Sequence, residues 1–147
     1  MLFRSLLLFF TGFSRSAAGI LQDQQVRSQA SDEEMLRNLH YVKELGLRSR
    51  AALESGDLVR FGELMHEHWE HKRRRSPGMS NEHVDGLYEL ARENGAIGGK
   101  LVGAGGGGFL LLYSRRPEDT RRAMARVNAP ELPFDFEFCG AYASEYA

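Results

Sequence analysis

The segment best suited to chemistry is a dense run of glycines followed by an apolar stretch. Seven of the eleven residues from Gly98 to Gly108 are glycine, and the apolar run 109–113 follows directly. Glycine loses much conformational freedom on folding, so such a cluster needs a reason. Successive backbone N–H groups in turns with positive φ form a concavity that binds anions. The run therefore predicts either a loop that approaches a phosphate or a tight hairpin that needs positive φ.

Two common nucleotide-binding motifs do not account for this segment. The stretch from Gly103 to Gly108 matches G-x-G-x-x-G, but a dinucleotide fingerprint opens a helix, whereas a strand-like run follows here. Gly99 and Lys100 look like the end of a Walker A loop, yet Leu101 stands where a Ser or Thr is required. The sequence instead predicts a strand, a glycine loop and a second strand.

A second candidate site lies near the N-terminus, where a strand gives way to a helix. Thr11, Arg15 and Ser16 occupy this corner, and the N-terminus of a helix suits an anion. An arginine there can hold a phosphate through two hydrogen bonds. The alternative is a serine that caps the helix beside a solvated arginine.

Three histidines on one predicted helix raise the question of a zinc site. Metalloproteases place two histidines four residues apart on one helical face. Here His66 and His71 are five apart, while His68 and His71 are three apart but lack an evident third ligand. We interpret the cluster as the polar edge of a helix anchored by Trp69, and we predict no metal site.

Basic residues beside these motifs allow more than one interpretation. The short run from Lys72 to Arg75 suits the end of a helix, where positive charge complements the macrodipole. Lys100 begins the glycine motif, and it can contact a phosphate or tie its strand to a carboxylate. The residues alone do not rank these two roles.

Composition narrows the class of protein. A chain of 147 residues with 42% hydrophobic and 27% charged residues suits one globular domain. The net charge of −1 gives no global attraction to nucleic acid or anionic lipid, so we predict neither as a partner. Cys139, the single cysteine, fits a reducing compartment. The apolar run 6–10 is too short for a signal peptide or a membrane span, so we expect a buried strand and a cytoplasmic protein.

The elements that must position these residues are helices and strands in a mixed order. Strands are predicted at 6–10, 100–102, 109–113 and around Phe134, Phe136 and Phe138, which alternate with acidic residues. Helices are predicted at 15–29, 31–53, from 58 into the basic run, from Ser80 to a cap at Gly95, and at 117–127. The order predicts an α+β fold, a four-stranded, mostly antiparallel sheet with helices on one face.

The glycine run resembles the third motif of the GHMP kinases, a family named for galactokinase, homoserine kinase, mevalonate kinase and phosphomevalonate kinase. That motif reads K-x-x-G-A-G-x-G-G before apolar residues, and here it spans Lys100 to Phe109. The four-glycine form resembles the branch that acts on heptose phosphates. The stretches 10–17, 68–72 and 76–81 resemble that branch as well, so the likeness runs in order along nearly the whole chain.

This resemblance implies a ferredoxin-like sheet enlarged by helices, in a kinase that uses ATP and Mg²⁺ to phosphorylate a hydroxyl of a sugar phosphate, with heptose 7-phosphate expected. In such kinases the glycine loop supports the main phosphate loop. Its residues here are Gly103, Ala104, Gly105, Gly106, Gly107 and Gly108. The corner at Thr11, Arg15 and Ser16 would face the active-site cleft, with Arg15 on the sugar's phosphate. Lys72 falls in a recurring W-x-x-K element that would point toward sugar hydroxyls or phosphate.

The sequence departs from the family in one important respect. The main phosphate loop, P-x-x-x-G-L-G-S-S-A, has no counterpart here. The catalytic Asp and the magnesium-binding acid also belong to the N-terminal domain, so no catalytic or metal-binding residue can be assigned. Because phosphoryl transfer needs a phosphate cradle, a metal and a positioned nucleophile, we expect this chain alone to be inactive.

We therefore expect residues 1–147 to be a C-terminal domain that begins at an internal methionine or fragment edge. The N-terminal ATP-binding domain would be its partner, in the same or a separate chain. Three alternatives stay open: a kinase for galactose or mevalonate, a freestanding anion-binding module without catalysis, and an inert truncated product.

Overall fold

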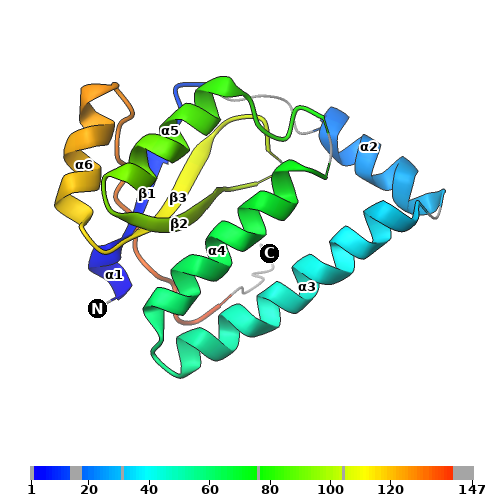
Figure 1. The fold of residues 1–147 in the computed structure, drawn as a ribbon, viewed down its shortest axis with the longest axis horizontal. Helices are drawn as coiled ribbons and strands as arrows, with labels where there is room; N and C mark the ends of the chain where they lie inside the picture. The colour runs from blue at the N-terminus through cyan, green and yellow to red at the C-terminus, as the bar shows by residue number, and fades with distance from the viewer. Residues whose placement is uncertain (1, 14–17, 31, 76, 104, 141–147) are drawn as a thin grey trace, which may run out of the picture.

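The computed structural model describes residues 2–13, 18–30, 32–75, 77–103 and 105–140, which form an α+β fold (Figure 1). The strands are β1 (Leu6–Phe10), β2 (Ala96–Leu101) and β3 (Phe109–Ser114). The helices are α1 (Leu2–Ser5), α2 (Ala18–Gln29), α3 (Glu33–Glu54), α4 (Leu58–Arg73), α5 (Glu82–Glu93) and α6 (Pro117–Arg126). Among the described helices, none is long and apolar enough to cross a membrane.

The three strands form an antiparallel sheet in the order β1-β3-β2. β1 pairs with β3 from Leu6 opposite Tyr113 to Phe10 opposite Phe109. One face of the sheet carries Leu7 and Leu112, which are fully buried with residues of α5 and α6. The strongly apolar β1 lacks alternation because its other face is partly covered as well.

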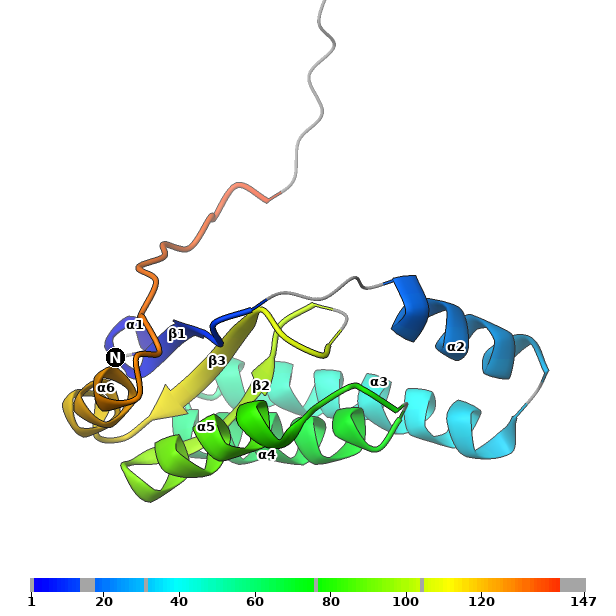
Figure 2. The same cartoon turned by 90° about the horizontal axis from the view of Figure 1, so that it is seen from above.

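α4 lies beside β2, the edge strand of the sheet (Figures 1 and 2), and its side chains join two separate core clusters. Its Trp69 joins the cluster under α5, whereas its Met65 packs with Leu6 and Tyr113. Because alternate residues of a strand point to opposite faces, helical residues contact both faces of the sheet through these two clusters. Our prediction from the sequence placed the helices on one face only.

The predicted fourth strand does not form around Phe134 and Phe138 in the described chain. Pairing occurs earlier, at an isolated bridge between Phe9 and Glu131, where the Leu132 N–H donates to the Leu8 carbonyl at 2.7 Å. Beyond this point the chain, orange in Figure 2, leaves the sheet. Alternating apolar and acidic residues form a strand only where the edge of a sheet is free to pair with them. Here the pairing with β1 is limited to the bridge between Phe9 and Glu131.

Helix boundaries agree with the prediction to within a few residues. The predicted cap Ser31 lies outside the described residues, and Asp32 caps α3 by accepting the Met35 N–H at 3.0 Å. α5 is capped by Asn81 rather than Ser80, because the Asn81 side-chain oxygen accepts the Val84 N–H. The short helix α1 was not predicted.

Two glycines allow α4 and β2 to touch backbone to backbone. A Cβ on Gly98 would lie 2.0 Å from the Gly62 carbonyl oxygen and 2.8 Å from the His66 backbone nitrogen. A Cβ on Gly62 would lie 2.6 Å from the Tyr113 ring. No side chain larger than hydrogen fits at either position, so the pair of glycines fixes where the helix lies on the strand.

Replacing Gly98 with alanine should weaken the fold strongly, because the added Cβ meets backbone atoms of α4 that cannot move without the whole helix. Overpacking of this kind costs about 1–3 kcal/mol and sometimes more. We expect a loss near the upper end of that range in the free energy of unfolding, measured by urea denaturation followed by circular dichroism.

The matched control is Gly46→Ala, since Gly46 lies within α3 and an added Cβ there would meet no atom within 4 Å. Alanine is favoured over glycine in a helix by about 1 kcal/mol, so this variant should be at least as stable as the native chain. Equal unfolding midpoints for the native chain and Gly98→Ala would contradict the close packing.

Candidate functional site

The glycine loop joins β2 to β3 and is held mainly by backbone hydrogen bonds. Four of its glycines have positive φ: Gly103, Gly105, Gly106 and Gly108. The Gly106 N–H donates to the Met79 carbonyl at 2.9 Å, and the Gly108 N–H donates to the Phe13 carbonyl at 2.8 Å. Ala104 lies outside the described residues. Because backbone carbonyls occupy these two N–H groups, neither is free to bind an anion.

Close contacts explain why Gly105 and Gly107 are glycine. A Cβ on Gly105 would lie 2.3 Å from the Met79 sulfur, and one on Gly107 would lie 2.8 Å from the Phe13 ring. Both interpretations drawn from the sequence thus have a physical basis here. The loop needs positive φ, and its backbone lies close to other parts of the protein.

Thr11 fastens the far end of this loop. Its side chain is 1% exposed, and its hydroxyl accepts the Gly108 N–H at 3.0 Å and lies 3.0 Å from the Gly108 carbonyl oxygen. The neighbouring candidates Arg15 and Ser16 lie outside the described residues. Thr11 therefore shapes the loop directly, and its role in substrate binding stays a prediction.

Lys72 connects the end of α4 to the start of the loop. The side chain is buried, and its Nζ donates to the carbonyl oxygens of Leu101 at 2.9 Å and Gly103 at 2.5 Å. Burial lowers the pKa of Lys72 to about 8, with smaller contributions from the positive charges of Lys100 and Arg75. The ammonium is thus held by two neutral carbonyls while cations surround it.

A cavity of about 430 Å³ opens beside Lys72. Its lining residues are Leu21 and Gln24 from α2, Val42 from α3, His68 and Lys72 from α4, Arg75 just beyond α4, and Gly103 from the loop. Burial lowers the pKa of His68 to about 4, helped by the charges of Lys100 and Lys72. One end of the cavity is therefore cationic, and the other is lined by neutral side chains.

The positive charges of Lys72 and Arg75 in this cavity, and of Lys100 near it, lack carboxylate partners. Among the described residues, Lys72, Lys100 and Arg75 form no salt bridge, and no acidic group contributes to the pKa shifts of the three. Burial lowers the pKa of each of them, so their charges are held in a partly desolvated place. Uncompensated cations at a cavity attract anions, and this is the chemistry that the site offers.

We did not predict Arg75 and His68 as site residues from the sequence. The basic run divides in the structure: Arg74 is exposed and paired with Glu70, whereas the Arg75 Nε donates to Asn38 at 3.0 Å. The Arg75 Nη2 is buried without a hydrogen-bond partner in the described chain. The sequence did contain a sign that these residues lie together. Lys72 follows His68 by four residues and precedes Arg75 by three, and such spacings place side chains on one face of a helix.

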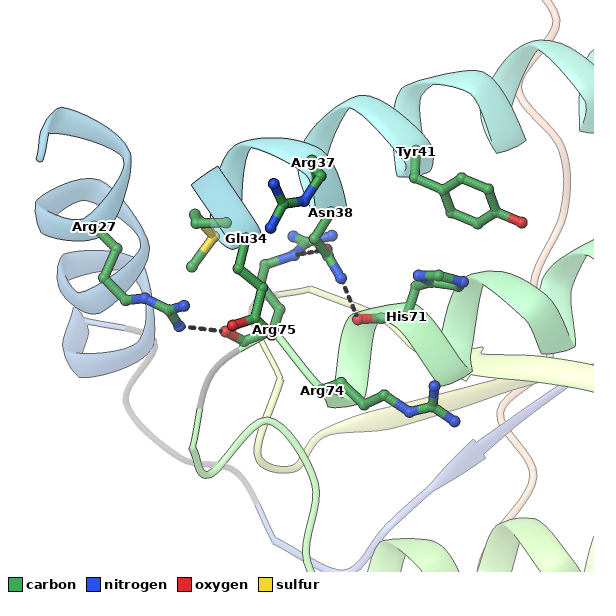
Figure 3. Close-up of a pocket in the computed structure, with 9 residues that line it drawn as sticks. Arg27, Glu34, Arg37, Asn38, Tyr41, His71, Arg74 and Arg75 are labelled. Atoms are coloured by element: carbon green, nitrogen blue, oxygen red, sulfur yellow. Dashed lines mark hydrogen bonds between the residues drawn. The ribbon is translucent and has the colours of Figure 1, made fainter. Parts of the chain in front are cut away.

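Arg75 also borders a second cavity of about 370 Å³ between α2, α3 and α4, shown in Figure 3. There Arg27 donates to the Arg75 carbonyl at 2.8 Å, and Asn38 donates to the His71 carbonyl at 2.9 Å. These bonds hold the last turn of α4 against α2 and α3. They explain how an arginine at a helix end is kept in place beside the first cavity.

The three histidines of α4 point to different surroundings. His66 Nδ1 lies 2.7 Å from the Tyr88 hydroxyl, and the His71 ring lies 4.1 Å from that of Tyr41. His68 lines the cationic cavity. Within the ranges that the structure describes, no group of three or more His, Cys, Asp or Glu could hold a metal ion.

The chain is similar to known small-molecule kinases. Residues 49–130 match the family model described as GHMP kinases C terminal. Over 107 residues the chain is 31% identical to the D-glycero-α-D-manno-heptose 7-phosphate kinase of Campylobacter jejuni, covering 73% of this chain and 31% of that protein. It is 34% identical over 122 residues to the bifunctional fucokinase/GDP-fucose pyrophosphorylase of Arabidopsis thaliana, covering 83% of this chain and 12% of that one.

Solved structures share the fold. The L. major mevalonate kinase in complex with R-mevalonate superposes with a TM-score of 0.75 at 24% identity, over 82% of this chain and 37% of that one. The chain thus spans about a third or less of each of these proteins. It belongs to the GHMP kinase family, with residues 49–130 matching the C-terminal domain of that family.

Proposed function

We propose that this chain is the C-terminal part of a kinase that transfers a phosphoryl group from ATP to a hydroxyl of a sugar phosphate. Family membership supports the reaction type. The observation that carries the choice of substrate is the cavity lined by Lys72 and Arg75, which, like the nearby Lys100, have no carboxylate partner among the described residues. In this proposal these three residues bind the phosphate that the substrate already carries.

The charge at the cavity distinguishes the substrates named for the relatives. Fucose is neutral and gives no compensation for three cations. Mevalonate carries one carboxylate, and a sugar phosphate carries up to two negative charges. Gln24 lies at the neutral side of the cavity, and its amide both donates and accepts hydrogen bonds, as recognition of sugar hydroxyls requires. We therefore favour a phosphorylated sugar, and among the relatives compared this points to heptose 7-phosphate.

The contribution of this chain to the reaction is binding and orientation. Cations on the resident phosphate would fix one end of the sugar, which places a hydroxyl at the other end for transfer. The glycine loop, fastened at Thr11 and Lys72, would form one wall beside the nucleotide phosphates. ATP would supply the phosphoryl group. The described residues include no acidic cluster that fits Mg²⁺, so we assign the metal and the catalytic base to the N-terminal ATP-binding domain.

That domain would be the partner of this chain, as part of the same polypeptide or as a separate one. The proposal also includes a cytoplasmic location, since ATP and phosphorylated sugars are supplied there. A freestanding anion-binding module would use the same cavity without catalysis, and the two experiments below separate these possibilities.

The first experiment measures binding of inorganic phosphate to the 147-residue chain by NMR titration. Charge-assisted hydrogen bonds contribute about 1.5–3 kcal/mol, so Arg75→Met should weaken phosphate binding by about tenfold or more. Arg74→Met is the matched control, because Arg74 is exposed and paired with Glu70. It should change the dissociation constant by less than about twofold. Equal losses in the two variants would remove Arg75 from the site.

The second experiment measures ADP release with ATP, Mg²⁺ and heptose 7-phosphate. The chain alone should be inactive, because it lacks a main phosphate loop and a catalytic acid. Joined to a GHMP kinase N-terminal domain that contains G-L-G-S-S, it should release ADP when the sugar phosphate is present. Sugar-dependent turnover by the chain alone would refute this division of labour, and a joined protein that prefers fucose would refute the choice of substrate.

A further inference from the structure

Lys72 belongs both to the hydrogen bonding of the glycine loop and to the lining of the cationic cavity. Its Nζ donates to the carbonyl of Leu101, the last residue of β2, and to that of Gly103, the first glycine of the loop. The same side chain lines the cationic cavity. A lysine ammonium has three N–H donors, and these two bonds leave one for a ligand.

We infer that Lys72 is a positioning residue through which an anion bound in the cavity orders the first half of the glycine loop. This inference rests on the proposed function, since it requires that the cavity binds an anion. It goes further in linking substrate binding to the loop that would border the nucleotide phosphates.

The charges around Lys72 give the physical reason. Lys100 on β2, His68 on α4 and Arg75, two residues beyond α4, interact electrostatically with it. α2 and α3 contribute the neutral side chains of Leu21, Gln24 and Val42 to the cavity. Without an anion, burial and the neighbouring cations disfavour the ammonium, and the pKa of Lys72 is lowered to about 8. An anion would reverse the local potential and raise that pKa. It would thereby strengthen the two hydrogen bonds that hold the loop, because charged donors bond more strongly than neutral ones.

The two halves of the loop are held in different ways. Gly106 and Gly108 donate to the carbonyls of Met79 and Phe13, so the second half is fixed by backbone bonds that do not involve Lys72. On the near side, Lys72 is the side chain that bonds the Gly103 carbonyl among the described residues. A change at Lys72 should therefore affect Gly103 and Gly105 more than the second half.

The test uses ¹⁵N relaxation of the 147-residue chain at pH 8, where about half of the Lys72 side chains are neutral without an anion, with and without saturating sulfate. Sulfate is chosen because it does not titrate near this pH. In the native chain the order parameters of Gly103 and Gly105 should rise on adding sulfate, while those of Gly106 and Gly108 change little. In Lys72→Met, sulfate should still bind through Arg75, the other cation that lines the cavity, more weakly, and the response of Gly103 and Gly105 should disappear.

Lys100→Met is the matched control, because it removes one cation from the same cluster but leaves both bonds from Lys72 to the loop. It should weaken sulfate binding and keep the loop response. A thermal melt checks that each variant is folded. The native chain gives a test without substitution: the pH at which Gly103 resonances titrate with Lys72 should rise from about 8 by about one unit when sulfate is present.

The outcomes separate this inference from the proposed function. Sulfate that binds without any change at Gly103 and Gly105, or an unchanged response in Lys72→Met, would overturn the coupling and leave the anion site standing. Failure of the native chain to bind either sulfate or phosphate would overturn the anion site and the coupling with it.

Discussion

The arrangement of this molecule depends on the direct contact between α4 and β2. Gly62 and Gly98 leave no room for a side chain between the helix and the strand, so the two elements can pack only in this position. From Gly62 to Lys72 the helix advances about 15 Å. From Gly98 to Gly103 an extended chain advances about 16 Å. Because the two distances match, a lysine ten residues along the helix meets the first glycine of the loop, two residues beyond the end of β2.

The contact between α4 and β2 builds the site, but it also lowers the stability of the fold by burying the charge of Lys72. Lys72 is brought to a buried place among other cations, and its folded-state pKa is lowered relative to the unfolded chain. The unfolded state therefore binds more protons between the two pKa values, and the stability of the fold rises with pH through that window, from about 8 upward. Near neutral pH the unliganded domain carries this cost in full. A bound anion would offset part of this cost.

Local signals in the sequence were enough for most of the fold, but contacts between distant elements were not. The apolar run of β1 and the Gly95 turn could be recognised, since each depends on neighbours in the chain. The N-caps of α3 and α5 were predicted one residue too early, at Ser31 and Ser80. β2 was predicted to begin at Lys100 because glycine disfavours strands, yet Gly98 and Gly99 belong to it since α4 packs on them. The sequence around Phe134 does alternate between apolar and acidic residues, but this pattern cannot show whether the edge of a sheet is free to pair with it.

In the candidate site, too, features that depend on neighbouring residues could be predicted, whereas features that depend on contacts between distant elements could not. The glycine loop was evident from composition alone, and Lys72 entered only through the family resemblance. Arg75 was interpreted as a solvated helix end, because nothing in the local sequence shows that Asn38, on another helix, holds its side chain beside the cavity. The loss of solvent around His68 depends likewise on α2 and α3, which cover that end of α4.

The spacing of Trp69 and Lys72 can now be explained physically. Residues three apart on a helix lie on the same face, so the fully buried Trp69 directs the stem of Lys72 toward β2 as well. A compact ammonium can donate to two carbonyls and still offer a third N–H to an anion. The planar fork of arginine suits two oxygens of one partner instead, so it would bind the anion or the loop but not both in this space. The W-x-x-K element thus combines an anchor for the helix with a donor that only lysine can supply.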